Sequence, residues 1–221
     1  MHLLIAYFGA VLGSFLFCMF SHRNSFEWLL KRRSTCDHCH HTLGIYDLWP
    51  VISYITNQGK CRYCRSPISI HYFYTELFAG ILFLILFDLN HLLFSVSLFS
   101  IFFFMVCYDF SQRWVPDFLF LIFFILGVFY NQQYHVISYS TLLVLLLIFI
   151  GLFSFFHQVI GGADIKFIFI SCLFLPITSF PLFIFLAASS GLLYAFLNKL
   201  RIIPFIPFLI LSFIILWQLL N

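Results

Sequence analysis

Long apolar runs, separated by short polar stretches, dominate the pattern of this 221-residue chain. A helix needs about 20 largely apolar residues to cross the hydrocarbon core of a bilayer. Eight runs approach that length: 3–20, 72–88, 92–109, 117–131, 140–156, 167–179, 181–197 and 205–220. The pattern therefore predicts an all-α polytopic membrane protein with about eight transmembrane helices. The composition, 63% hydrophobic and only 9% charged, excludes a soluble globular protein.

The lysines and arginines indicate how these helices are oriented. If there are eight spans, all eleven basic residues fall in alternate loops on one side, and the opposite loops near 89–91, 132–139 and 180 hold none. Cytoplasmic loops carry an excess of Lys and Arg, so we expect the basic side to be cytoplasmic and both chain ends to face outward. The first run lacks a basic stretch before it and a small-residue cleavage site after it, which favours a retained helix over a signal peptide.

One loop, 21–71, is much longer than the others and carries two Cys-x-x-Cys pairs. Cys36 and Cys39 form the first pair, and Cys61 and Cys64 form the second. Each pair offers two thiolates at the spacing that a tetrahedral ion needs, and four thiolates close the shell around zinc. We therefore predict a cytoplasmic, zinc-ribbon-like loop after the first helix. Its zinc would be structural, because a closed shell leaves no position for a reacting water.

Other features of this loop leave alternatives open. Three histidines are candidate substitute ligands: His38, His40 and His41. The alternative to a metal site is a set of four free thiols in a reducing compartment. The loop has too little apolar content for a core of its own, so a bound ion would supply folding free energy. Its net positive charge suits anionic lipid headgroups or an acidic substrate segment, although a solvated basic loop accounts for it equally well.

Two aspartates stand where an ordinary membrane protein would not place them. Asp109 ends the third apolar run, and Asp164 precedes the sixth in the segment GGADIK, 161–166. A carboxylate close to hydrocarbon is costly, which makes it a candidate functional residue. In the predicted topology both lie at the cytoplasmic boundary, where a pair could share one proton and activate a water molecule, as in aspartic proteases. The structural alternatives are a helix N-cap for Asp164 and a solvated helix end for Asp109.

Six motifs, taken in order along the chain, resemble those of type IV prepilin peptidases, the leader peptidases of competence pili and type II secretion. The matching segments extend over most of the chain: 13–16 (GSFL), the cysteine segment 36–64 with 46–47 (YD) and 50–53 (PVIS), 66–69 (SPIS) with 74–77 (YTEL), 108–109 (YD) with 115–117 (VPD), 161–166 (GGADIK) and 204–209 (PFIPFL). Two positions depart from the family pattern. Ala163 replaces the glycine before the second aspartate, and Ile206 replaces the glycine of the last motif.

The resemblance implies a bifunctional membrane enzyme. It would cleave the short basic leader from prepilin-like proteins at the cytoplasmic face and then N-methylate the new amino terminus with S-adenosyl-L-methionine. Asp109 and Asp164 match the catalytic aspartates of the family. Asp117 is expected to cap the fourth helix, and Lys166 either to orient Asp164 or to face lipid headgroups. Glu76 matches a family carboxyl to which the sequence assigns no role.

The same interpretation divides the chain into three domains. They are a first transmembrane helix at 1–20, a cytoplasmic zinc-binding domain at 21–71 and a transmembrane aspartyl peptidase core at 72–221. The expected location is the plasma membrane of a bacterium. Expected partners are prepilin-like substrates and membrane lipids, and no nucleic acid. The sequence indicates neither the methyl-donor site nor the oligomeric state.

Three other classes of protein share part of this pattern. An intramembrane aspartyl protease of the presenilin or signal-peptide-peptidase type would share Tyr108-Asp109, but its late Pro-Ala-Leu motif is absent and the cysteine loop has no place in it. A non-catalytic membrane module would use the zinc loop to bind a partner and would tolerate asparagine at both aspartates. A transporter with a carboxylate proton relay would need its carboxylates near the middle of the membrane.

Overall fold

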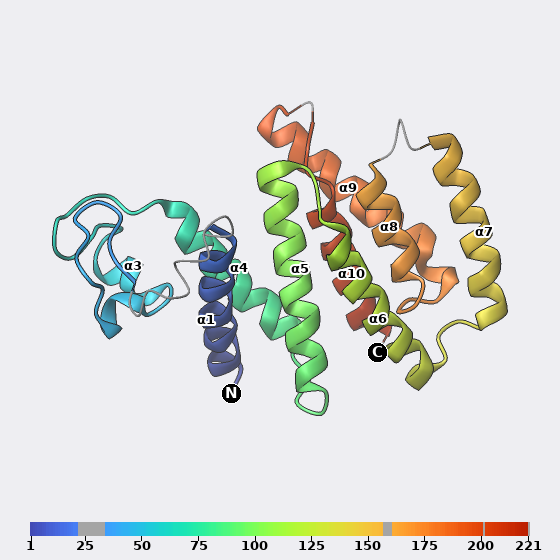
Figure 1. Ribbon diagram of the computed structural model, residues 1–221, viewed down its shortest axis with the longest axis horizontal. Helices are drawn as coiled ribbons and strands as arrows, with labels where there is room; N and C mark the ends of the chain where they lie inside the picture. Colours follow the sequence, from blue (N-terminus) through green and yellow to red (C-terminus); the bar gives the residue numbers. More distant parts are fainter. Residues whose placement is uncertain (22–33, 157–160, 201, 221) are drawn as a thin grey trace. The chain divides into compact units, whose positions relative to one another are not determined.

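The computed structural model describes residues 1–21, 34–156, 161–200 and 202–220, which form helices joined by loops (Figure 1). Its α-helices are α1 (His2–Ser21), α3 (Ile52–Thr56), α4 (Ile70–Leu86), α5 (Leu92–Gln112), α6 (Asp117–Tyr134), α7 (Tyr139–Phe156), α8 (Gly162–Ser171), α9 (Phe180–Asn198) and α10 (Ile206–Leu220). Two short 3₁₀ helices are η1 (Ile45–Leu48) and η2 (Ile177–Ser179). The predicted all-α class is confirmed.

Part of the predicted topology falls outside the described residues. This applies to residues 157–160 of one predicted cytoplasmic loop and to five basic residues: Arg23, Lys31, Arg32, Arg33 and Arg201. Every predicted apolar run overlaps a helix. Four described helical segments are long and apolar enough to cross a membrane: His2–Ser21, Leu92–Gln112, Asp117–Tyr134 and Ile177–Asn198. Ile70–Leu86 and Ile206–Leu220 are shorter apolar helices, and the count of eight spans stays a prediction.

The sixth apolar run folds differently from its prediction. A helix was expected over 167–179, whereas α8 begins at Gly162 and ends at Ser171. Pro176 accounts for the early end, because proline lacks an N–H and disfavours helical backbone at the residue before it. The chain instead makes turns after Ser171 and then forms η2. Because α8 begins at Gly162, Asp164 lies within the first turn of a helix rather than before it.

The chain divides into two compact units, Met1–Phe103 and Phe104–Asn221. In the first unit, small residues let α1 and α4 approach closely. A Cβ added to Gly13 of α1 would overlap the Cβ of Ala79, and one added to Gly80 of α4 would lie 2.8 Å from the carbonyl oxygen of Ala6. Small residues at such contacts are the usual means by which membrane helices pack, since lipid removes most of the hydrophobic driving force between them.

An aromatic core holds the second unit together. Phe123 of α6 stacks on Phe167 of α8, with ring centroids 5.2 Å apart, and on Phe174, at 5.1 Å. Phe213 of α10 meets both of these rings edge-on. These rings are almost completely buried, so α6, α8 and α10 are fixed against one another through large apolar surfaces. The amino ends of α8 and α10, which carry Asp164 and the main-chain N–H of Ile206, are thereby positioned.

Candidate active site and metal centre

Asp109 lies near the end of α5 and is a buried carboxylate, with only 7% of the residue exposed. The main-chain N–H of Ile206 donates a hydrogen bond of 3.0 Å to its Oδ2. Ile206 is the first residue of α10, and the carbonyl of Phe205 accepts hydrogen bonds from the N–H groups of Phe208 and Leu209. Asp109 is therefore held at the amino end of a helix, where N–H groups lack intrahelical partners. It is not the solvated helix-end residue that the sequence left open.

Asp164 is the third residue of α8, and its carboxylate lies over Gly161. A Cβ added to Gly161 would be 2.8 Å from Asp164 Oδ2, so the glycine leaves the room that this carboxylate occupies. The N-cap position belongs to Gly161, which rules out the N-cap interpretation of Asp164. Ala163 lies inside the helix, where its backbone needs no glycine. This departure from the family pattern is therefore accommodated without strain.

The structure brings the two aspartates together in the second unit. Their carboxylates are near enough for a direct electrostatic interaction, and the charge of Arg113, one turn after Asp109, also acts on Asp109. A pair of carboxylates at the amino ends of two helices is an arrangement that can bind and activate a water molecule. Their catalytic role stays a prediction.

Lys166 pairs with Asp117 rather than with Asp164, and a contact with lipid headgroups stays a prediction. Its Nζ lies 2.6 Å from Oδ1 of Asp117, at the start of α6, and 5.8 Å from the centre of the Phe120 ring. The expected cap at Asp117 is wrong, because the N-cap of α6 is Pro116 and Asp117 is the first helical residue. This ion pair joins the segment 115–117 to the segment 161–166. Lys166 is therefore engaged with Asp117 and not with Asp164.

The first pair of cysteines lies in a tight turn. Thr35 and Thr42 form an isolated antiparallel bridge at its base. The N–H of Cys36 donates to the carbonyl of His41, and the N–H of His40 donates back to the carbonyl of Cys36, each at 2.9 Å. His40 has a φ of 56°, in the left-handed region that closes the turn.

The second pair lies in a turn of the same design. Lys60 and Pro67 form the bridge, the N–H of Cys61 donates to the carbonyl of Ser66 at 2.8 Å, and the N–H of Arg65 donates to the carbonyl of Cys61 at 3.0 Å. Arg65, like the equivalent residue of the first turn, has a positive φ, of 59°. The two Cys-x-x-Cys segments are therefore structural repeats.

The four thiols of these turns gather into one cluster, as predicted. The Sγ atoms of Cys36, Cys39, Cys61 and Cys64 all lie within 4.8 Å of one another. A tetrahedral zinc with Zn–S bonds of about 2.3 Å holds its sulfurs roughly 3.8 Å apart, so the arrangement fits such an ion after a small contraction. The Ser66 hydroxyl, 3.0 Å from Cys64 Sγ, lowers the pKa of Cys64 to about 6, which favours the thiolate that binds a metal.

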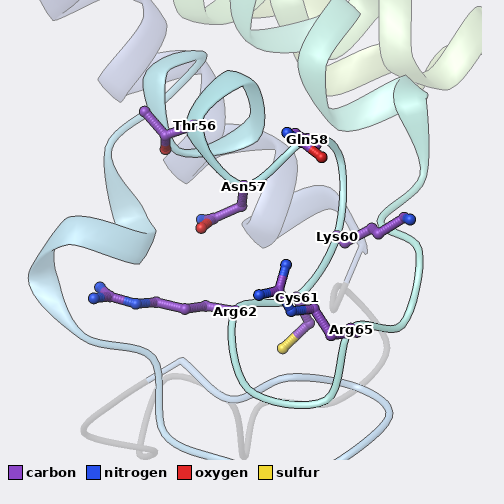
Figure 2. Close-up of a pocket in the computed structure, with 7 residues that line it drawn as sticks. All are labelled: Thr56, Asn57, Gln58, Lys60, Cys61, Arg62 and Arg65. Carbon is purple, nitrogen blue, oxygen red and sulfur yellow. The ribbon is translucent and has the colours of Figure 1, made fainter.

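A basic hollow of about 240 Å³ adjoins the cluster. Its lining residues, labelled in Figure 2, are Thr56, Asn57, Gln58, Lys60, Cys61, Arg62 and Arg65. The side chains of Lys60 and Arg62 extend in opposite directions from it. The side of the cysteine segment that carries the second turn is therefore positively charged.

Glu76 of α4 joins three of the sequence motifs. Its Oε1 accepts a hydrogen bond from the Ser14 hydroxyl of α1 at 2.8 Å, and its Oε2 accepts one from the N–H of Val51 at 2.7 Å. Val51 precedes α3 and has a φ of 63°, which β-branched residues rarely adopt. The carboxylate thus ties the cysteine segment to α1 and α4, and it holds a strained backbone in place.

These features define a class: a polytopic membrane protein with a pair of neighbouring aspartates, one of them buried, and a four-cysteine cluster. Comparison with known proteins gives the family. Residues 7–89 match the family model of the bacterial peptidase A24 N-terminal domain, and residues 96–196 match that of the type IV leader peptidase family. The chain belongs to the type IV prepilin peptidase family. The four clustered cysteines fall in the first matched region, and both aspartates fall in the second.

Several relatives named prepilin leader peptidase/N-methyltransferase are similar to parts of the chain. The protein of Burkholderia pseudomallei (strain 1026b) is 48% identical over 50 residues, which is 23% of this chain and 16% of the relative. Those of Myxococcus xanthus and Bacillus subtilis are 35% identical over 75 residues and 34% identical over 76 residues. Each of these two alignments spans 34% of this chain, and they span 22% and 31% of the respective relatives. No solved structure matches the chain.

Proposed function

We propose that this protein is a membrane aspartic endopeptidase that cleaves the leader of type IV prepilin-like precursors. The observation that carries the proposal is the proximity of Asp109 and Asp164, which come from different helices within the region matched by the leader peptidase family. Asp109 is buried and accepts a hydrogen bond from the N–H of Ile206, which is unlike a solvated helix end.

The chemistry follows from two neighbouring carboxyls. Both cannot ionise easily at short range, so the pair holds one proton. The ionised carboxylate takes a proton from a water molecule, whose oxygen attacks the scissile carbonyl carbon. The protonated carboxyl donates to the carbonyl oxygen and stabilises the charge that develops there. No covalent acyl-enzyme is formed.

The substrate and the side of cleavage follow from the predicted topology. A prepilin-like precursor offers a basic leader followed by an apolar helix, so its scissile bond would lie at the membrane boundary. We place the aspartates and the cysteine segment at the cytoplasmic face of a bacterial plasma membrane, because the basic residues gather on that side. Impermeant thiol labelling of single introduced cysteines at Gln133 and Arg113 checks this, with Gln133 expected to be the labelled position in intact cells.

The cysteine cluster is proposed to hold one structural zinc through Cys36, Cys39, Cys61 and Cys64. Four thiolates complete a tetrahedral shell, so the ion would stabilise the fold of the cysteine segment and take no part in hydrolysis. On this basis 21–71 forms a zinc-binding domain between the first transmembrane helix, 1–20, and the peptidase core, 72–221.

Methylation of the new amino terminus is proposed from the names of the relatives, which include N-methyltransferase. S-adenosyl-L-methionine would supply the methyl group. No residue of the chain is assigned to its binding, and the proteolytic proposal does not depend on it.

The decisive experiment combines the purified full-length protein, in lipid nanodiscs, with a prepilin-like substrate and follows the product by mass. Wild-type protein should release the leader. Asp109→Asn and Asp164→Asn should each abolish cleavage while leaving the protein folded, since asparagine keeps the size but cannot exchange the proton. Asp117→Asn serves as the matched control and should retain most of the activity. Cleavage at near wild-type rate by both dyad variants would instead favour the non-catalytic membrane module.

A further inference from the structure

The two aspartates have unequal surroundings. Asp109 accepts the N–H of Ile206 at 3.0 Å and feels the positive charge of Arg113. In the part of the chain that the structure describes, Asp164 has no hydrogen-bond donor on its carboxylate, and the charge that acts on it is that of Asp109. Lys166, only two residues further along α8, pairs with Asp117 instead.

This difference decides where a shared proton resides. A hydrogen-bond donor and a nearby cation both stabilise the ionised form of a carboxyl group, whereas a nearby carboxylate disfavours it. Asp109 has the first two influences and, among the described residues, Asp164 has neither, whereas the repulsion between the two carboxylates acts on both alike. The amino end of α10 adds the favourable field of the helix dipole at Asp109, and α10 itself carries no titratable side chain. The groups that set the balance are therefore Ile206 N–H, Arg113 and the two carboxyls.

We propose that the main-chain N–H of Ile206 is a positioning group that makes Asp109 the general base and leaves Asp164 as the general acid. This rests on the proposed function. Asp109 takes one proton from water as the water oxygen bonds to the carbonyl carbon, and Asp164 gives its proton to the carbonyl oxygen. When the C–N bond breaks, the leaving amine takes the proton from Asp109. The carbonyl re-forms as one hydroxyl returns a proton to Asp164, which restores the starting state.

The proposal also gives a role to the PFIPFL motif, 204–209. A main-chain donor does not depend on the side chain that it carries. Isoleucine at 206 therefore preserves the contact although it departs from the glycine of the family pattern. The Ile206 side chain is fully buried and anchors the start of α10.

Ile206→Pro tests the donor directly, because proline has no N–H and the first position of a helix tolerates it. Ile206→Val is the matched control, since it removes a similar side-chain volume and keeps the N–H. For Ile206→Pro we expect kcat to fall roughly 10- to 100-fold, the range for one hydrogen bond to a charged group, with KM little changed. The loss of activity on the acid side should also begin at higher pH. Ile206→Val should lose clearly less activity than Ile206→Pro and should keep the wild-type onset of the acid-side loss, because it keeps the N–H.

A second variant keeps the test decisive if Ile206→Pro does not fold, as judged by its thermal unfolding in nanodiscs. Arg113→Gln removes the other stabilising influence on Asp109 from an exposed position and should move the acid-side loss in the same direction. Unchanged kcat and pH profile in Ile206→Pro, equal losses in Ile206→Pro and Ile206→Val, or an unchanged profile in Arg113→Gln would each overturn the proposal. Failure of the wild-type protein to cleave would instead overturn the proposed function.

Discussion

Lys166 and Asp117 form an ion pair with 2.6 Å between Nζ and Oδ1, and this contact joins the two segments that carry the family's aspartate motifs. Asp117 opens α6 and Lys166 belongs to the first turns of α8. The pair is largely accessible at its acidic end, where the Asp117 side chain is 79% exposed. An ion pair this exposed contributes little to stability.

Loss of this ion pair should have only a small effect on cleavage activity and on stability. We expect Lys166→Met to retain most of the cleavage activity and to lower the free energy of unfolding by less than about 1 kcal/mol, the usual worth of an exposed ion pair. Asp117→Asn should have a similar effect, and the double variant should cost no more than either alone. Cleavage rates and thermal unfolding measure both quantities. If Lys166→Met abolished cleavage as completely as Asp164→Asn, Lys166 would act on Asp164 after all.

The cysteine cluster predicts the metal content of the purified protein. Elemental analysis should return about one zinc per chain, because four thiolates complete one tetrahedral site. Cys61→Ser should lose the zinc, whereas Cys18→Ser, outside the cluster, should keep it. Removal of the zinc should make the cysteine segment sensitive to proteolysis before the membrane helices unfold. A metal-free wild-type protein with a protease-resistant cysteine segment would contradict the assignment.

Replacement of Glu76 should release the cysteine segment from α1 and α4. Glu76→Ala leaves the Val51 N–H without its acceptor, and such a loss costs roughly 1–3 kcal/mol. Glu76→Gln should be milder, because an amide oxygen still accepts from Val51. The matched control is Thr75→Ala, whose hydroxyl donates to the carbonyl of Tyr72 in its own helix. Thermal unfolding and proteolysis near 45–56 report the effect, and equal stability of Glu76→Ala and Thr75→Ala would refute this role.

Gly161 should be essential to the position of Asp164. A methyl group there would lie 2.8 Å from the carboxylate, so Gly161→Ala should displace it and reduce cleavage by tenfold or more, with little loss of stability. Gly151→Ala is the control, because nothing lies within 4 Å of its added Cβ. Ala163→Gly should leave cleavage almost unchanged, since Ala163 has ordinary helical backbone. Wild-type kinetics in Gly161→Ala would show that this contact does not matter.

The sequence predicted the features that depend on local pattern. Apolar runs indicated the helices, and the Cys-x-x-Cys spacing indicated a cluster that needs only two turns to form. Local pattern could not predict the hydrogen bond from the Ile206 N–H to Asp109, because it joins residues far apart in the chain and its donor is a backbone group. The same holds for the contact of Val51 with Glu76. The contact of Lys166 with Asp117 is not visible in the sequence because the two residues lie on different helices. The early end of α8 is not visible in the hydropathy pattern, which does not register the effect of Pro176.

The repeated turns around the cysteines bear on how the metal centre is assembled. Each turn closes with the same backbone hydrogen bonds and the same bridge, none of which involves a sulfur atom. Each half can therefore be preformed before any ion arrives, with its two thiols already side by side. The ion would then link two turns that are already folded. Metal uptake should therefore be fast, and it should change the distance between the two turns more than the backbone conformation of either turn.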